Sequence, residues 1–414
     1  MIDYTTLELA NGLKVIFHKD TSTPMVCVNI LYNVGARDEN PEKTGFAHLF
    51  EHLMFGGSKN IPDYDAVIEE AGGENNAFTN NDITNYYLTF PKEFIELAFW
   101  LESDRMNELA FSPKSLSVQK NVVIEEFKQH YLNQPYGDVS HLLKPLAYKE
   151  HPYRWNTIGK EVSHIEDASL DDVKAFFYKF YRPNNAILVV AGNTTMEEVE
   201  HLAKKWFEPI PRGEDYRRNL PKEPRQTEAR TLHVERDVPA DAIYKAYHIC
   251  NRMHPDYYAF DLISDVLSNG KSSRLYNDLV KRQGLFTEIN AYITGDTDEG
   301  LFIFTGKLCE GITMQQAESA IDEEIEKMKG ELIPETELTK VKNKLETHYV
   351  FSLYKPLDRA MNLAYYHWLG DINLINTEPQ NYQKITAEGI QALVKATFIP
   401  ENSSTLYYHK KSIK

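Results

Sequence analysis

The sequence predicts a mixed α and β protein built from two similar halves. Segments that alternate apolar and polar residues, as strands do, occur near the start of each half, and segments with helical spacing follow them. A stretch at 209–231 is rich in Pro, Arg and Glu and separates the halves. The order of strands and helices recurs beyond it, which indicates an internal structural repeat. We therefore expect a first domain at 1–211, a linker at 212–230 and a second domain at 231–414.

Hydrophobic periodicity and turn residues place the individual elements along the chain. In the first half the expected strands are 13–17, 26–31, 85–90 and 186–191. One expected helix includes residues 48–52, and the others are 64–71, 94–109, 113–133 and 196–207. In the second half the expected strands are 242–249 and 301–307, and the expected helices are 258–267, 274–282 and 314–329, with further long helices towards the C-terminus. Both halves therefore combine strands with several helices.

The run His48-Leu49-Phe50-Glu51-His52 has the H-x-x-E-H pattern of zinc hydrolases. Each residue of an α-helix turns by about 100°, so positions i and i+4 nearly superimpose and i+3 lies beside them. His48 and His52 can thus bind one metal ion, while Glu51 projects into the same space. Apolar residues flank the run on both sides, and Gly56 ends the helix, as expected for a buried helix rather than a solvated one. We expect two imidazole ligands and a general base here.

A third zinc ligand is expected on the long helix that begins at Pro113. Glu125 and Glu126 lie in an apolar stretch of this helix, where unpaired carboxylates are seldom buried. Spacing alone leaves open which of them points inward, although a salt-bridged surface position suits Glu125. A separate site made of Glu126 and His130 is an alternative, but it would lack a neighbouring base.

The chain resembles the pitrilysin-type (M16) zinc metallopeptidases, in the short-chain branch that includes the mitochondrial processing peptidase. The resemblance covers essentially the whole chain. It rests on the runs His48 to Gly57, Asn76 to Thr79, Thr84 to Tyr87, Val122 to Glu126 and Ser272 to Tyr276. The family register selects Glu126 as the third zinc ligand. Many relatives carry a further glutamate two turns earlier on this helix, and Gln119 stands there in this chain, so the surroundings of the metal are expected to differ.

The resemblance implies an α+β fold of two homologous domains. Each has an antiparallel sheet with helices packed on one side, and the domains enclose a peptide chamber on dimerisation. The family also implies that Asn76 and Ala77 lie on an edge strand that pairs with the substrate backbone. Arg359 and Tyr366, two helical turns apart, correspond to a pair that faces the active site from the non-catalytic half and stabilises the oxyanion.

Composition excludes several other classes of function. The net charge of −16 argues against nucleic-acid binding, and no apolar run is long enough to span a membrane. The N-terminus lacks the features of a secretory signal, although a trimmed signal would leave the same sequence. Cys27, Cys250 and Cys309 are widely spaced and odd in number, which favours free thiols in a reducing compartment, so we expect a cytoplasmic protein.

The expected function is that of a zinc-dependent endopeptidase that hydrolyses short or unfolded peptides. His48, His52 and Glu126 would bind one Zn²⁺ per chain, and Glu51, Arg359 and Tyr366 would be catalytic. Because one chain carries both the zinc motif and the Arg/Tyr pair, we expect a homodimer. The alternatives are a heterodimer with a related chain and a non-catalytic scaffold subunit, although scaffold chains usually have eroded motifs.

Overall fold

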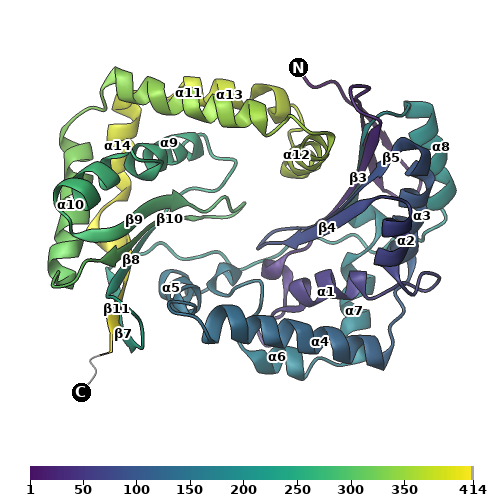
Figure 1. Ribbon diagram of the computed structural model, residues 1–414, viewed down its shortest axis with the longest axis horizontal. Coiled ribbons are helices and arrows are strands. Elements are labelled where there is room, and N and C mark those ends of the chain that lie inside the picture. The colour runs from purple at the N-terminus through teal and green to yellow at the C-terminus, as the bar shows by residue number, and fades with distance from the viewer. Residues whose placement is uncertain (412–414) are drawn as a thin grey trace. The chain divides into compact units, whose positions relative to one another are not determined.

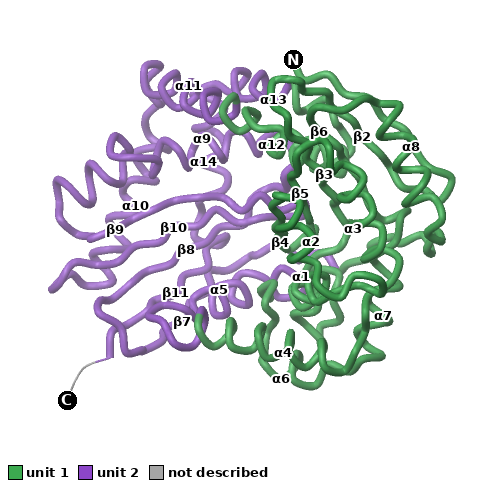
Figure 2. Tube along the Cα trace, turned by 45° about the vertical axis from the view of Figure 1, so that its right-hand side comes forward, with its two compact units in different colours: residues 1–129, 155–220, 350–376 green, residues 130–154, 221–349, 377–414 purple. Residues whose placement is uncertain are grey.

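The structure is a computed structural model, and it describes residues 1–411. The chain forms two compact units, which are coloured separately in Figure 2. The first unit comprises residues 1–129, 155–220 and 350–376, and the second comprises residues 130–154, 221–349 and 377–414. Each unit contains one sheet and its own set of helices.

The sheet of the first unit has six strands in the order β1-β2-β6-β3-β5-β4. Its strands are β1 (Thr5–Glu8), β2 (Lys14–Lys19), β3 (Met25–Tyr32), β4 (Glu74–Thr79), β5 (Thr84–Pro91) and β6 (Ala186–Gly192). The pair of β2 and β6 is parallel, and the remaining pairs are antiparallel. The central strands β3 and β6 are almost wholly buried, while β4 alternates and lies at the edge of the sheet.

Helices cover both faces of this sheet. They are α1 (Phe46–Phe55), α2 (Tyr64–Glu70), α3 (Ile95–Asn107), α4 (Pro113–Phe127), α6 (Val162–Glu166), α7 (Leu170–Phe180), α8 (Met196–Trp206) and α12 (Pro356–Leu369), with short helices η1 (Ala36–Asp38), η2 (Lys92–Phe94) and η5 (Pro183–Asn185). Figure 1 shows α3 and α8 on one side of the strands and α12 on the other. Successive side chains of a strand point to opposite faces. Accordingly, Tyr86 contacts Arg105 of α3, whereas Tyr87 lies on the face covered by α12.

The sheet of the second unit has five strands in the order β7-β11-β8-β10-β9. Its strands are β7 (Arg230–Arg236), β8 (Ala242–His248), β9 (Phe286–Ile293), β10 (Leu301–Leu308) and β11 (Ser403–Lys410). Its helices are α5 (Val139–Ala147), α9 (Tyr257–Ser268), α10 (Met314–Gly330), α11 (Glu335–Phe351), α13 (Leu374–Gln383) and α14 (Ala387–Thr397), with η3 (Lys128–Leu132), η4 (Pro152–Arg154), η6 (Tyr276–Arg282) and η7 (Pro400–Asn402); the ends of η3, α11 and α13 belong to the first unit. Again one strand pair, β7 and β11, is parallel.

Two hydrophobic clusters lie on opposite faces of the second sheet. Ile243 and Tyr247 of β8 pack with α9, α10 and α14 in the larger cluster. Tyr244 and Ala246, which alternate with them, pack against α5 in the smaller cluster. Each unit therefore has one face covered mainly by its own helices and the other by a helix from the opposite half of the sequence, α12 in the first unit and α5 in the second.

The α+β fold class with two sheets is confirmed, and the expected strands are present within one or two residues of their predicted bounds. Each sheet differs from the expected antiparallel sheet with helices on one side, because it contains one parallel pair and is covered on both faces. The compact units differ from the expected contiguous division, since residues 130–154 belong to the second unit and residues 350–376 to the first. The long helix from Pro113 keeps α geometry only to Phe127 and continues as the π-helical turn η3. Within residues 1–411, no helix is long and apolar enough to span a membrane.

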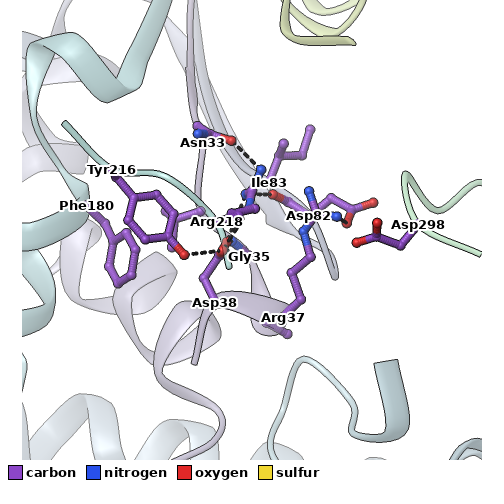
Figure 3. Close-up of polar contacts among 12 residues, drawn as sticks. Asn33, Gly35, Arg37, Asp38, Asp82, Ile83, Phe180, Tyr216, Arg218 and Asp298 are labelled. Carbon is purple, nitrogen blue, oxygen red and sulfur yellow. Dashed lines mark hydrogen bonds and ion pairs between the residues drawn. The ribbon is translucent and has the colours of Figure 1, made fainter. Parts of the chain in front are cut away.

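The beginning of the expected linker is fixed on the first unit. Arg218 donates from Nε to Asp38 Oδ1 at 2.7 Å and from Nη2 to Asp38 Oδ2 at 2.9 Å, while the hydroxyl of Tyr216 donates to the same carboxylate at 2.8 Å (Figure 3). Arg218 also donates to Asn33 Oδ1 and to the carbonyl oxygen of Asp82. The Asp38 side chain is fully buried, so these donors compensate its desolvation.

Candidate metal centre

The helix α1 presents the three motif side chains on its partly exposed face. The other face is apolar: Ala47, Leu49, Phe50 and Met54 are fully buried. The ring of Phe50 stacks with Phe176 of α7 at a centroid distance of 4.9 Å. This packing fixes the rotation of α1 about its axis, and therefore the direction in which the motif residues point.

The structure brings His48, His52 and Glu126 together. Glu126 Oε2 lies 3.7 Å from His48 Nε2 and 3.4 Å from His52 Nε2. The two imidazole rings are perpendicular, with centroids 4.8 Å apart. Among the described residues, this is the one group of three or more His, Cys, Asp or Glu side chains whose ligand atoms all lie within 4.8 Å of one another.

This donor set fits a zinc ion. Two ligand atoms that share a tetrahedral zinc, each about 2.0 to 2.1 Å from the metal, are about 3.3 Å apart. The two carboxylate-to-imidazole distances are close to that separation without any rearrangement of the backbone. Two nitrogens and one carboxylate oxygen are also the protein ligands typical of a catalytic zinc, which keeps a fourth position for water.

The geometry distinguishes Glu126 from the two other candidates on its helix. The Glu125 side chain is 71% exposed and forms an ion pair with Lys128 at 2.7 Å, as expected for a helix surface. His130 lies in η3, beyond the end of α4, and its Nδ1 is 3.4 Å from the amide of Gln134. Neither side chain belongs to the cluster of candidate ligands.

Burial sets the protonation states that a metal site requires. It lowers the pKa of His48 to about 4, although the nearby Glu126 opposes this shift, so His48 is neutral at physiological pH and can offer an Nε2 lone pair. Burial raises the pKa of Glu51, while hydrogen bonding to Thr79 opposes the shift. A raised pKa suits a carboxyl that acts as a general base. His48 Nδ1 is buried and has no hydrogen-bond partner in the described structure.

Two further residues lie near the motif helix, Thr79 and Gln119, and the sequence predicted a role only for Gln119. Thr79, at the end of β4, hydrogen-bonds Glu51. The sequence predicted no role for Thr79, although this residue belongs to the run Asn76 to Thr79 that matches the family. Gln119 lies close to Gly56, which ends α1. A Cβ atom placed on Gly56 would be 3.6 Å from the Nε2 atom of Gln119. The expected influence of Gln119 on the metal stays a prediction.

Asn76 and Ala77 lie on β4, the edge strand, and pair with Tyr87 and Tyr86 of β5. Asn76 Oδ1 accepts a hydrogen bond from the exposed Ala77 N–H at 2.8 Å. An added strand that used this N–H would have to displace the Asn76 side chain. The location is compatible with substrate binding by strand addition, which stays a prediction for these two residues.

Arg359 and Tyr366 lie on α12, which packs against β3 and β6 of the first unit. Arg359 donates from Nη1 to Asp20 Oδ2 at 2.6 Å and from Nε to the carbonyl oxygen of Leu353 at 2.7 Å. Tyr366 is buried, with 3% of its surface exposed. The pair was expected on the second domain, so its place in the first unit differs from that expectation. Its oxyanion role stays a prediction.

Two imidazoles and a carboxylate that converge on one point, beside a second carboxylate of raised pKa, are the side chains of a metallohydrolase. Residues 14–161, which include all four, match the family model described as "Insulinase (Peptidase family M16)". Residues 167–345 match the model "Peptidase M16 inactive domain". The chain belongs to the M16 family of peptidases, of the pitrilysin type.

Known relatives support a peptidase function with a zinc cofactor. The chain is 29% identical to "Zinc protease PqqE" of Helicobacter pylori, over 98% of this chain and 92% of that protein. It is 28% identical to "Mitochondrial-processing peptidase subunit beta" of Saccharomyces cerevisiae, over 50% of this chain and 45% of that one. Among solved structures, "a protease from Helicobacter pylori" has a TM-score of 0.92 at 29% identity, covering 99% of this chain and 100% of the other.

Proposed function

We propose that this chain is a zinc endopeptidase that hydrolyses short or unfolded peptides, with one zinc ion per chain. The observation that carries the proposal is the convergence of His48, His52 and Glu126 beside Glu51 on the partly exposed face of α1. When bound, zinc supplies a Lewis acid that polarises a carbonyl and lowers the pKa of water.

The residues of the chain would then do the remaining work. Glu51 takes a proton from the attacking water and later gives it to the nitrogen of the leaving amine. The edge of β4 at Asn76 and Ala77 binds the substrate backbone as an added strand, so affinity depends mainly on main-chain hydrogen bonds and specificity is broad. Arg359 and Tyr366 stabilise the oxyanion, which requires Arg359 Nη1 to exchange Asp20 for the substrate oxygen.

We propose a homodimer in which two copies enclose the peptide chamber, and a cytoplasmic location. The location is supported by Cys27, Cys250 and Cys309, which form no disulfide in the described structure, as is usual in a reducing compartment. The dimer is supported by the presence of both the zinc motif and the Arg/Tyr pair in one chain.

The test uses the purified chain alone. Zinc is measured by elemental analysis, turnover of a fluorogenic peptide is followed with the molecular mass in solution, and zinc is then removed with a chelator and restored. The proposal expects about one zinc per chain, cleavage that disappears with the chelator and returns with zinc, and the mass of a dimer. A zinc-free, inactive chain would instead support a scaffold subunit. Zinc binding with turnover only after a related chain is added would support a heterodimer.

A further inference from the structure

The N-terminus of the motif helix is held by a side chain that precedes it in sequence. The first amides of an α-helix have no partner within the helix. The N-cap residue of α1, Gly45, has no side chain to accept from them. Glu39 accepts instead: its Oε2 takes the Gly45 N–H at 2.9 Å and its Oε1 takes the Ala47 N–H at 2.8 Å.

Glu39 is also rigidly placed. It is 6% exposed and directly follows η1. The indole of the buried Trp155 donates a hydrogen bond to the carbonyl oxygen of Ala36. The carboxylate of Asp38 accepts hydrogen bonds from Arg218 and Tyr216 (Figure 3). Because both ends of η1 are fixed in this way, the carboxyl of Glu39 is a fixed point to which the start of α1 is attached.

Ala47 directly precedes His48, so the bond from its N–H to Glu39 lies within one residue of the first candidate ligand. To bind one metal ion, His48 and His52 must also both stay close to Glu126, which is on a different helix, α4. A shift of the first turn of α1 would change the His48-to-Glu126 distance of 3.7 Å. Metal affinity is sensitive to the groups that orient ligands.

We propose that Glu39 is a positioning residue for the metal centre, which fixes the first turn of α1 so that His48 meets His52 and Glu126 at zinc-binding separation. This inference rests on the zinc function proposed above. Either protonation state of the Glu39 carboxyl can accept from both amides, because a carboxyl oxygen keeps a lone pair when it is protonated. A glutamine cannot, because its amide nitrogen has no free lone pair, so Glu39→Gln would leave one buried N–H unpaired.

The test compares Glu39→Gln with Thr195→Ala. Thr195 caps α8, a first-unit helix without any candidate ligand, and its Oγ1 accepts the Glu198 N–H at 3.2 Å. Zinc affinity is measured by competition with a chromogenic chelator, and the cobalt-substituted protein is examined by visible absorption. We expect Glu39→Gln to raise the dissociation constant for zinc by about tenfold or more and to alter the cobalt spectrum. Thr195→Ala should lower the melting temperature and leave both properties unchanged.

Unchanged zinc affinity and an unchanged cobalt spectrum in Glu39→Gln would overturn the inference, as would equal losses in the two variants. Absence of zinc binding by the wild-type chain would be a different result, because it would overturn the proposed function itself. If Glu39→Gln does not fold, Glu39→Asp carries the test. Its shorter side chain keeps the carboxylate but can no longer reach both amides, so the same weakening of zinc affinity is expected.

Discussion

Replacing Arg218 with methionine tests whether the buried carboxylate of Asp38 depends on this cation. The change keeps most of the aliphatic length of the side chain and removes the four hydrogen bonds that Arg218 donates to Asp38, Asn33 and the Asp82 carbonyl. Asp38 would remain fully buried, with only the Tyr216 hydroxyl and the Gly35 N–H as donors.

The size of the expected loss of stability follows from how deeply Arg218 and Asp38 are buried. Removing one partner of a fully buried ion pair costs about 3 to 5 kcal/mol. The Arg218 side chain is 19% exposed and Asp38 keeps two donors, so we expect a loss of about 2 to 3 kcal/mol in the free energy of unfolding of the first unit. Asp38→Asn in the Arg218→Met background removes the stranded charge. A double-mutant cycle should therefore give a coupling energy of about 1 to 3 kcal/mol.

The assay is urea unfolding followed by tryptophan fluorescence. All four tryptophans, at positions 100, 155, 206 and 368, lie in the first unit, so their emission reports that unit even if the second unfolds separately. The neighbouring, exposed Arg217 provides the matched control, and Arg217→Met should change stability by no more than about 0.5 kcal/mol. Equal effects of the two methionine variants, or a coupling energy near zero, would refute the reasoning.

Three further outcomes are expected. Glu126→Gln should lose zinc at chelator concentrations that leave Glu125→Gln fully loaded, because only Glu126 approaches the imidazoles; elemental analysis after dialysis decides this, and equal retention would contradict it. Burial raises the pKa of the Cys27 thiol to about 12, so this thiol should react with an alkylating reagent at about pH 8 only after unfolding, as peptide mass spectrometry would detect. A hydrogen bond from Lys43 lowers the pKa of Asp172 to about 2, against about 4 when unfolded, so its stabilising effect is complete above about pH 4 and is lost as the pH falls towards 2. The melting temperature of Asp172→Asn should accordingly fall less between about pH 5 and 3 than that of the wild type.

Local patterns in the sequence predict the strands and helices well but not which sheet each helix covers. The alternation at 26–31 corresponds to β3, and the helix expected at 196–207 is α8. By contrast, α12 packs on the first sheet although it comes from the second half of the chain. Its buried residues are Ala360, Leu363, Ala364 and Tyr366, an apolar set that suits packing on a sheet but does not say on which one.

The candidate site was predictable where its geometry is local. Helical spacing alone places His48, Glu51 and His52 on one face. The choice of Glu126 over Glu125 needed the register of the family, because both residues lie in the same apolar stretch. The contacts of Thr79 and Glu39 with this helix depend on how a strand and a loop meet it, and no periodicity encodes such contacts.

The linker shows the same limit. Its polar composition predicts an exposed connection, yet Tyr216 and Arg218 converge on Asp38, about 180 residues earlier in the chain. The sequence could not indicate that pairing, because an arginine in a polar segment looks the same in the sequence whether its side chain is solvated or paired.

The most direct test of the central claim is peptide cleavage by the zinc-loaded Glu51→Gln chain. Glu51 is not among the candidate ligands, so the variant should bind as much zinc as the wild type. Because glutamine cannot accept the proton of the attacking water, cleavage of the fluorogenic peptide should be abolished. Full zinc content with no cleavage is the predicted result. Cleavage at a rate near that of the wild type would contradict the assignment of Glu51 as the base and, with it, the proposed chemistry of this site.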